Sequence, residues 1–339
     1  MKRSFFLLLV LILIGIGINS QDDRAFAATM EYSVKANLPE NQLNKNLSYF
    51  DLKMSPGNKQ TITITVSNTS DRKMELMIET NTATTNQNGV IDYSKADSKK
   101  DSSLKYAFSD LISPSQKVIL EANETKTLPF TIKMPEKSLD GVILGGFYIY
   151  EVIQEDKKTS DKSVQINNEF SYVIGVKLTE TNKLVTPELQ LNKVKPELLN
   201  YRNAVTANLQ NIKPVIINNL TVDARITKEG EQKVLHLTKK QSLSMAPNSN
   251  FDFPISWDNQ EFEPGKYHLY ITATAGKDTW EFDKMFEIKD TAAEKLNLTA
   301  VKAKKEYSKI IIWSASVLAA VLLITILLVK NKRKPKEED

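Results

Sequence analysis

The side chains that most often carry out catalysis or bind metals are scarce in this sequence. Cysteine is absent, and the two histidines, His236 and His268, lie in alternating stretches and are not near each other in sequence. A metal site needs three or four convergent ligands, so a structural or solvent-facing role is the better interpretation of both. The Gly-x-Ser-x-Gly elbow, His-Glu-x-x-His and the glycine-rich dinucleotide fingerprint do not occur either. We therefore predict no catalytic residues, no metal and no cofactor, and a protein that is not an enzyme.

One polar stretch has the composition of a ligand-binding surface. Thr80–Ser94 reads TNTATTNQNGVIDYS and is rich in asparagine and threonine, with one tyrosine. Turn formation around Asn88-Gly89 explains this composition simply. The alternative is a polar shelf that hydrogen-bonds glycan hydroxyl groups. Its candidate glycan-binding residues are Asn81, Thr84, Asn86, Asp92 and Tyr93.

Aromatic residues in the second half of the chain give another candidate surface. Trp257 and Trp280 lie on or just after alternating stretches, with Tyr267 and Tyr270 nearby. Packing in a core is the simpler interpretation. The alternative is an exposed platform for a partner or a sugar, because aromatic side chains are common binding anchors. The candidate partner-binding residues are Trp257, Tyr267 and Trp280.

The elements that must position these residues are strands. Apolar and polar residues alternate in QTITITVSN, KTLPFTIKM, NFDFPISW, GKYHLYITATA and WEFDKMFEIK, as expected for half-buried strands. Two segments also follow the same order, in which a turn and an alternating strand precede a glycine, Gly141 or Gly265, that opens an aromatic-rich strand. The sequence therefore predicts an all-β protein with two tandem immunoglobulin-like β-sandwich domains.

The stretch Gly141–Tyr150, GVILGGFYIY, is predicted to be a sandwich strand that pairs with Phe170–Leu178 as a hairpin. Gly145 and Gly146 indicate a bulge or a close approach between sheets. The polar stretch that joins the two strands is predicted to be a long exposed loop. The predicted domains are residues 28–182 and 183–290. Residues 291–309 have a helix-forming composition and are predicted to be a stalk that contributes nothing to the sandwich cores.

The two ends predict export and anchoring. Residues 1–27 have the basic start, apolar run and small-residue cleavage site of a signal peptide, and an uncleaved anchor is the alternative. Residues 310–329 are apolar and long enough for a single transmembrane helix. A basic tail, residues 330–339, follows and is predicted to be cytoplasmic. The predicted location is the cell membrane, with the ectodomain in the cell-wall zone.

The charge and the absence of cysteine narrow the class of protein. The net charge is +4, of which the signal and the tail contribute most, so the nearly neutral ectodomain does not indicate nucleic-acid binding. An exported animal module of this size usually has disulfides, so a chain with no cysteine suits a Gram-positive surface protein.

Several stretches together resemble one family along essentially the whole chain. Those in the first half are YSVKANLPENQ, YFDLKMSPGNKQTITITVSNTSD, NTATTNQNGVIDYS and DGVILGGFYI. Those in the second half are FSYVIGVKLTE, ANLQN, MAPNSNFDFPISW, PGKYHLYI and WEFDKMFEI. They are similar to the two domains of the WxL-interacting proteins. The resemblance implies a first domain that binds peptidoglycan, a second that binds host proteins, and WxL-domain proteins as partners. The family places its domain boundary just before FSYVIGVKL, which the hairpin prediction assigns to the first domain.

The expected function is that of a membrane-anchored, non-enzymatic scaffold that binds WxL-domain proteins and peptidoglycan at the cell wall. One alternative is an adhesin whose second domain binds host extracellular-matrix proteins. Another is a cell-wall hydrolase.

Overall fold

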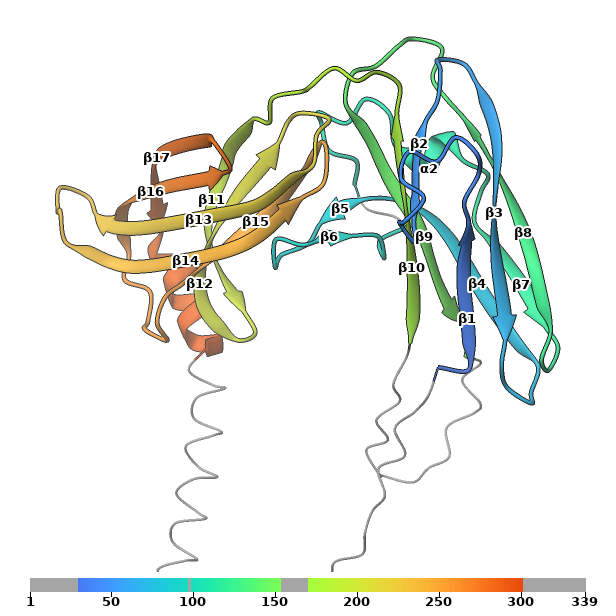
Figure 1. The fold of residues 1–339 in the computed structure, drawn as a ribbon. Helices are drawn as coiled ribbons and strands as arrows, with labels where there is room; N and C mark the ends of the chain where they lie inside the picture. Colours follow the sequence, from blue (N-terminus) through green and yellow to red (C-terminus); the bar gives the residue numbers. More distant parts are fainter. Residues whose placement is uncertain (1–29, 97–98, 154–169, 301–339) are drawn as a thin grey trace, which may run out of the picture.

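The computed structural model describes residues 30–96, 99–153 and 170–300, which form two β-sandwiches set as the two arms of an arch (Figure 1). The predicted signal peptide, apolar span, tail and most of the predicted exposed loop lie outside the described residues. Among the described residues, no helix is both long and apolar enough to cross a membrane.

The first sandwich packs a three-stranded sheet against a five-stranded one. The three-stranded sheet has the order β1 (Tyr32–Asn37), β3 (Lys59–Asn68), β8 (Thr125–Lys133). The five-stranded sheet has the order β2 (Phe50–Lys53), β10 (Ser171–Thr179), β9 (Val142–Glu151), β4 (Met74–Thr82), β7 (Gln116–Leu120). The alternating apolar residues of both sheets meet in one core, which includes Phe50, Leu76, Phe130 and Phe147, all with almost no exposed surface.

The second sandwich repeats this plan with longer strands. Its three-stranded sheet has the order β11 (Leu189–Leu199), β12 (Arg202–Asn211), β15 (Ser249–Ser256). Its four-stranded sheet has the order β14 (Val234–Met245), β13 (Ile217–Lys228), β16 (Gly265–Ala275), β17 (Asp278–Ile288). The second core is separate from the first and includes Val222, Phe253 and Leu269. The prediction of an all-β protein built from two sandwiches is confirmed.

The predicted hairpin around GVILGGFYIY is present. Strand β9 pairs antiparallel with β10 from Val142↔Thr179 to Tyr150↔Ser171 without a register shift, so Gly145 and Gly146 form no bulge. They mark close approaches instead. A Cβ atom on Gly145 would lie 2.1 Å from Cδ1 of Phe108, which belongs to the short helix α2 (Phe108–Leu111). The close neighbour of Gly145 is therefore this ring within the domain, and not the opposite sheet.

The start of the predicted stalk is part of the second domain. Residues 290–300 are helical, Ala293 is buried in the second core, and Leu296 packs against it. Asn297 Oδ1 accepts hydrogen bonds from the Phe262 amide (2.8 Å) and from Nδ2 of Asn203 (2.9 Å). Its Nδ2 donates to the Phe262 carbonyl (2.9 Å). The prediction that the stalk contributes nothing to the cores is wrong for this part, because one face of the helix is apolar and Asn297 pairs with otherwise unsatisfied backbone groups.

Candidate functional site

The five predicted glycan-binding residues do not form one open surface. Asn86 Oδ1 accepts hydrogen bonds from the amides of Asn88 (2.9 Å) and Val90 (3.2 Å), and it closes the turn between β5 (Thr84–Thr85) and β6 (Ile91–Asp92). Asp92 Oδ1 accepts two hydrogen bonds from Ser94. The Thr84 hydroxyl donates to the carbonyl of Asp92 (3.4 Å). For these three residues, the structure agrees with the interpretation as turn chemistry.

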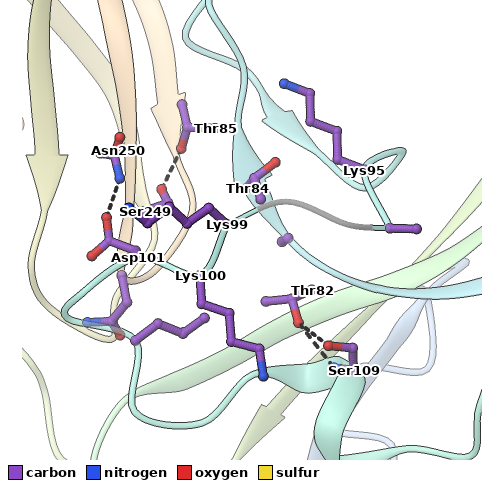
Figure 2. Close-up of a pocket in the computed structure, with 14 residues that line it drawn as sticks. Thr82, Thr84, Thr85, Lys95, Lys99, Lys100, Asp101, Ser109, Ser249 and Asn250 are labelled. Atoms are coloured by element: carbon purple, nitrogen blue, oxygen red, sulfur yellow. Dashed lines mark hydrogen bonds between the residues drawn. The ribbon is translucent and has the colours of Figure 1, made fainter.

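The β5–β6 hairpin joins the two domains (Figures 1 and 2). The hydroxyl groups of Thr85 and Ser249 are 2.6 Å apart, and the amide of Ala246 donates to Thr85 Oγ1 (3.0 Å). The amide of Ser244 donates to the carbonyl of Gly89 (2.7 Å). A Cβ atom on Gly89 would lie 2.9 Å from Leu243, so only glycine allows this approach without a shift. Much of the stretch that resembled a glycan shelf is therefore a contact between domains.

A second contact at this junction is centred on the Asp101 carboxylate (Figure 2). Asp101 Oδ1 accepts hydrogen bonds from the Ser103 amide (2.8 Å) and from Nε2 of Gln210 (2.6 Å), and Oδ2 accepts one from Nδ2 of Asn250. Beside it lies a cavity of about 180 Å³ between the hairpin, the loop that carries Lys100 and strand β15. The Lys100 ammonium at this cavity is paired with Asp110. The cavity thus lies within the joint between the domains.

A partly exposed aromatic surface lies on the outer face of the five-stranded sheet. In β9, Phe147 and Ile149 point into the core, so the alternation places Tyr148 and Tyr150 on the opposite face. Their ring centroids are 5.4 Å apart. Tyr93 lies across the glycines of this face, because a Cβ atom on Gly146 would be 2.9 Å from its ring.

Tyr49 extends this surface. A Cβ atom on Gly175 of β10 would lie 3.7 Å from the Tyr93 hydroxyl and 3.8 Å from Cβ of Tyr49. Tyr49 itself is 38% exposed, and Val173, which pairs with Tyr148 across the ladder, is 48% exposed. We call this surface the tyrosine face; it consists of Tyr49, Tyr93, Tyr148 and Tyr150.

A carboxylate holds the polar groups of the tyrosine face in place. Glu79 of β4 accepts a hydrogen bond from the Tyr150 hydroxyl at Oε1 (3.1 Å) and from Asn81 Nδ2 at Oε2 (3.1 Å). Asn81 also donates to the Tyr93 carbonyl (2.9 Å). Burial, and then the Glu79 carboxylate, raise the pKa of Tyr150, while burial and then Tyr49 raise the pKa of Tyr93 to about 12. Both phenols therefore stay neutral hydrogen-bond donors at physiological pH.

The structure thus assigns two of the predicted glycan-binding residues to this face and adds others. Tyr93 is part of it, and buried Asn81 supports it from below. Sequence reasoning missed Tyr49, Glu79, Tyr148 and Tyr150. A usable signal was present in GFYIYE, where the period-two pattern that buries Phe147 and Ile149 places the two tyrosines on the outer face of the sheet, where they are half-buried.

The predicted partner-binding aromatic residues lie mainly in the second core. Trp257 is 3% exposed and Tyr267 is 2% exposed, and the centroids of their rings are 5.5 Å apart. The structure therefore agrees with the simpler interpretation of core packing, and the alternative of a surface platform is wrong for both, because β16 turns the Tyr267 ring inward and Trp257, directly after β15, packs into the same core. Trp280 is half-buried against the same core, and its binding role stays a prediction.

Both histidines make local contacts. Nδ1 of buried His236 is 2.8 Å from Asp258, and Nε2 of His268 is 2.6 Å from Asp283. The described residues contain no group of three or more histidines, cysteines or acidic residues that could hold a metal ion.

Comparison with known families decides the identity of the chain. Residues 32–151 match the model for "WxL Interacting Protein, peptidoglycan binding domain", and residues 161–298 match "WxL Interacting Protein, host binding domain". The chain belongs to the WxL-interacting protein family. In this WxL-interacting protein, the four tyrosines all lie within the peptidoglycan-binding match. Strand β10 lies within the second match, although the structure pairs it with β9 and β2 of the first domain.

Other comparisons add little about function. No curated protein matches the chain. A chaperone–tip adhesin complex of CFA/I fimbriae is 15% identical, with a TM-score of 0.28, over 70% of this chain and 94% of that chain. The class 5 fimbriae chaperone CfaA is 17% identical, with a TM-score of 0.27, over 75% and 98%. The E. coli chaperone DraB is 13% identical, with a TM-score of 0.27, over 76% and 98%. Likenesses this low carry no conclusion about what the chain binds.

Proposed function

We propose that this protein is a non-enzymatic cell-surface scaffold that binds peptidoglycan through the tyrosine face and protein partners through its second domain. One observation carries the first part: a partly exposed aromatic surface lies on the domain whose sequence matches the peptidoglycan-binding model. The apolar face of a sugar ring packs well on an aromatic ring, and neighbouring polar groups fix its orientation. Glu79 and the tyrosine hydroxyls supply such groups.

The carboxylates on this face favour binding over hydrolysis. A glycosidase needs two carboxyl groups about 5 to 9.5 Å apart. Glu75 and Glu79 share the outer face of β4 but are four residues apart, which is about 13 Å along a strand. Glu75 is also paired with Lys117 at 2.8 Å. The tyrosine face therefore has a geometry that favours holding a glycan over cleaving it.

The second domain is the proposed site for proteins. WxL-domain proteins are the proposed partners on the basis of the family. A host extracellular-matrix protein is the alternative, and the description of the matched model as a host binding domain supports a host ligand in general. A pull-down with a WxL-domain protein and with matrix proteins distinguishes the two, because retention of matrix proteins alone would favour the adhesin.

Membrane anchoring is proposed from the sequence. The uncharged residues 310–329 and the basic residues after them support a single span with a cytoplasmic tail. Two central charges cost about 5 to 7 kcal/mol on the insertion scale. Leu318→Arg with Leu322→Arg should therefore release the protein from the membrane fraction after a salt wash. Retention of this variant would contradict the single-span proposal.

Sedimentation with purified peptidoglycan tests the glycan-binding proposal. The full-length protein should sediment with the wall material, and Tyr148→Ala combined with Tyr150→Ala should lower the bound fraction strongly. Tyr201→Ala is the matched control, because Tyr201 is 70% exposed in the turn between β11 and β12, in the second domain. Equal binding by the double variant and the control would reject the tyrosine face as the wall-binding site.

A further inference from the structure

We infer that the tyrosine face recognises the uncharged, N-acetylated sugar backbone of peptidoglycan, and neither its stem peptides nor the anionic polymers of the wall. This inference rests on the proposed function and narrows its ligand to one chemical class.

Backbone pairing argues against a peptide ligand. Extended peptides bind sheets mainly by adding a strand to an edge, where main-chain groups are unpaired. Strand β9, which carries Tyr148 and Tyr150, is central: it pairs with β10 on one side and β4 on the other. Its amide and carbonyl groups are engaged in both ladders. A ligand on this face therefore meets side chains only, which suits stacked sugar rings.

The charges on the face argue against an anionic polymer. Lys117 and Lys177 stand on the same sheet face, and each is ion-paired, with Glu75 (2.8 Å) and Asp51 (3.2 Å) respectively. Glu79, beside the tyrosines, forms no ion pair within the part of the chain that the structure describes. Among the described residues, its carboxylate accepts hydrogen bonds from Tyr150 and Asn81. A phosphate or carboxylate polymer would bring like charge to Glu79, and the carboxylates already paired with Lys117 and Lys177 offset the charge of these two lysines.

The same carboxylate suits an N-acetylated amino sugar. A carboxylate accepts hydrogen bonds from hydroxyl and amide N–H groups, both of which such a sugar carries. Tyr148 and Tyr150 are two residues apart on one face, and Tyr93 covers the next position of that face, at Gly146. Successive positions on one face are about 6 to 7 Å apart along the strand. Consecutive rings of an extended glycan can therefore lie over consecutive tyrosines.

Four probes applied to the full-length protein test this inference by titration. They are an oligomer of N-acetylglucosamine, glycan strands freed of peptide by an amidase and then amidated at the muramic-acid carboxyl groups so that they carry no charge, isolated stem peptides, and the phosphate polymer extracted from walls. We expect binding to the first two only. Tyr148→Ala with Tyr150→Ala should weaken oligomer binding about tenfold or more, which corresponds to the loss of about 1.4 kcal/mol of stacking. Tyr201→Ala should leave it unchanged.

Conservative variants separate recognition from folding. Tyr148→Phe with Tyr150→Phe keeps both rings and should retain most of the oligomer binding. Glu79→Gln keeps an acceptor but removes the charge, so it should increase binding of the phosphate polymer. The inference would be overturned if the protein bound stem peptides, or if it bound intact walls but neither of the two glycan probes. In either case, the proposal that the protein binds the wall would still stand. If intact peptidoglycan is not bound at all, the proposed function itself fails.

Discussion

Replacement of Gly145 by alanine tests whether the Phe108 ring of α2 determines the packing of strand β9, which carries Tyr148 and Tyr150. A methyl group at this position would lie 2.1, 2.2 and 2.5 Å from Cδ1, Cγ and Cβ of Phe108. Phe108 is completely buried, and its Cβ cannot move away without moving the backbone of α2. The clash must therefore shift the helix or bend β9, whose opposite face carries Tyr148 and Tyr150.

The expected cost follows from the depth of this overlap. Overpacking a well-packed core typically costs about 1 to 3 kcal/mol, and we expect Gly145→Ala at the upper end because three atoms overlap. For a domain of roughly 150 residues, 1 kcal/mol shifts the melting temperature by about 2 to 4 °C. The first domain should therefore melt roughly 6 to 12 °C lower, as measured by calorimetry or circular dichroism.

Two controls make this reasoning refutable. Gly175→Ala adds the same methyl group to the neighbouring strand β10, where the nearest atom would be 3.7 Å away, so it should change the melting temperature little. Phe108→Ala alone should cost about 3 to 5 kcal/mol by leaving a cavity. Combined with Gly145→Ala, it should cost less than the sum of the single changes, because the new methyl group enters the vacated space. If the stability costs of the two single changes simply add in the double variant, the Phe108 ring is not the group that excludes a side chain from position 145.

Three further predictions concern the junction, the C-terminal helix and pH. Asp101→Ala removes the shared acceptor of Gln210 and Asn250, so a spin-label distance between the domains should broaden and stability should fall by about 1 to 3 kcal/mol. Asn297→Ala leaves both polar groups of Phe262 unpaired, so it should lower the melting temperature of the second domain only, by calorimetry. The pKa of Tyr93, raised to about 12 from an ordinary value near 10, contributes stability that is full below pH 10 and lost as pH rises through 12. Tyr93→Phe should therefore make the decline in melting temperature between pH 10 and 12 less steep, and an unchanged decline would contradict this.

Local patterns in the sequence predicted the strands because alternation and turn chemistry act over a few residues. Gly141 and Gly265, which open the two repeated strands, both have positive φ angles (97° and 153°). Gly89 has a φ of 70° in the turn predicted at Asn88-Gly89. The pairing of Phe170–Leu178 with the GVILGGFYIY strand followed because the alternating patterns on both sides of a polar stretch required a common core.

Contacts between distant segments could not be predicted in this way. The polar stretch Thr80–Ser94 resembles an exposed shelf by composition, yet Thr85 is buried because Ser249, 164 residues later, lies against it. Tryptophan is a common anchor at binding sites, but the ring centroid of Trp257 lies 3.9 Å from that of His236 within the core. Neither outcome follows from spacing, since each depends on which surfaces the two domains and sheets bring together.

The junction also determines where a glycan would lie relative to the second domain. Leu144 shares the outer face of β9 with Tyr148 and Tyr150, and it packs with Ala246 of the second domain. The tyrosine face therefore begins at the contact between the domains and follows β9, a strand of the first arm of the arch (Figure 1). Strand β10 completes this face with Gly175 and Val173, although it lies in the sequence range matched by the host-binding model. The hairpin β5–β6 and Asp101 hold the two domains together, so they would fix the distance between the second domain and a glycan bound on the tyrosine face. This arrangement suits a protein that must hold a partner at a set place beside the wall.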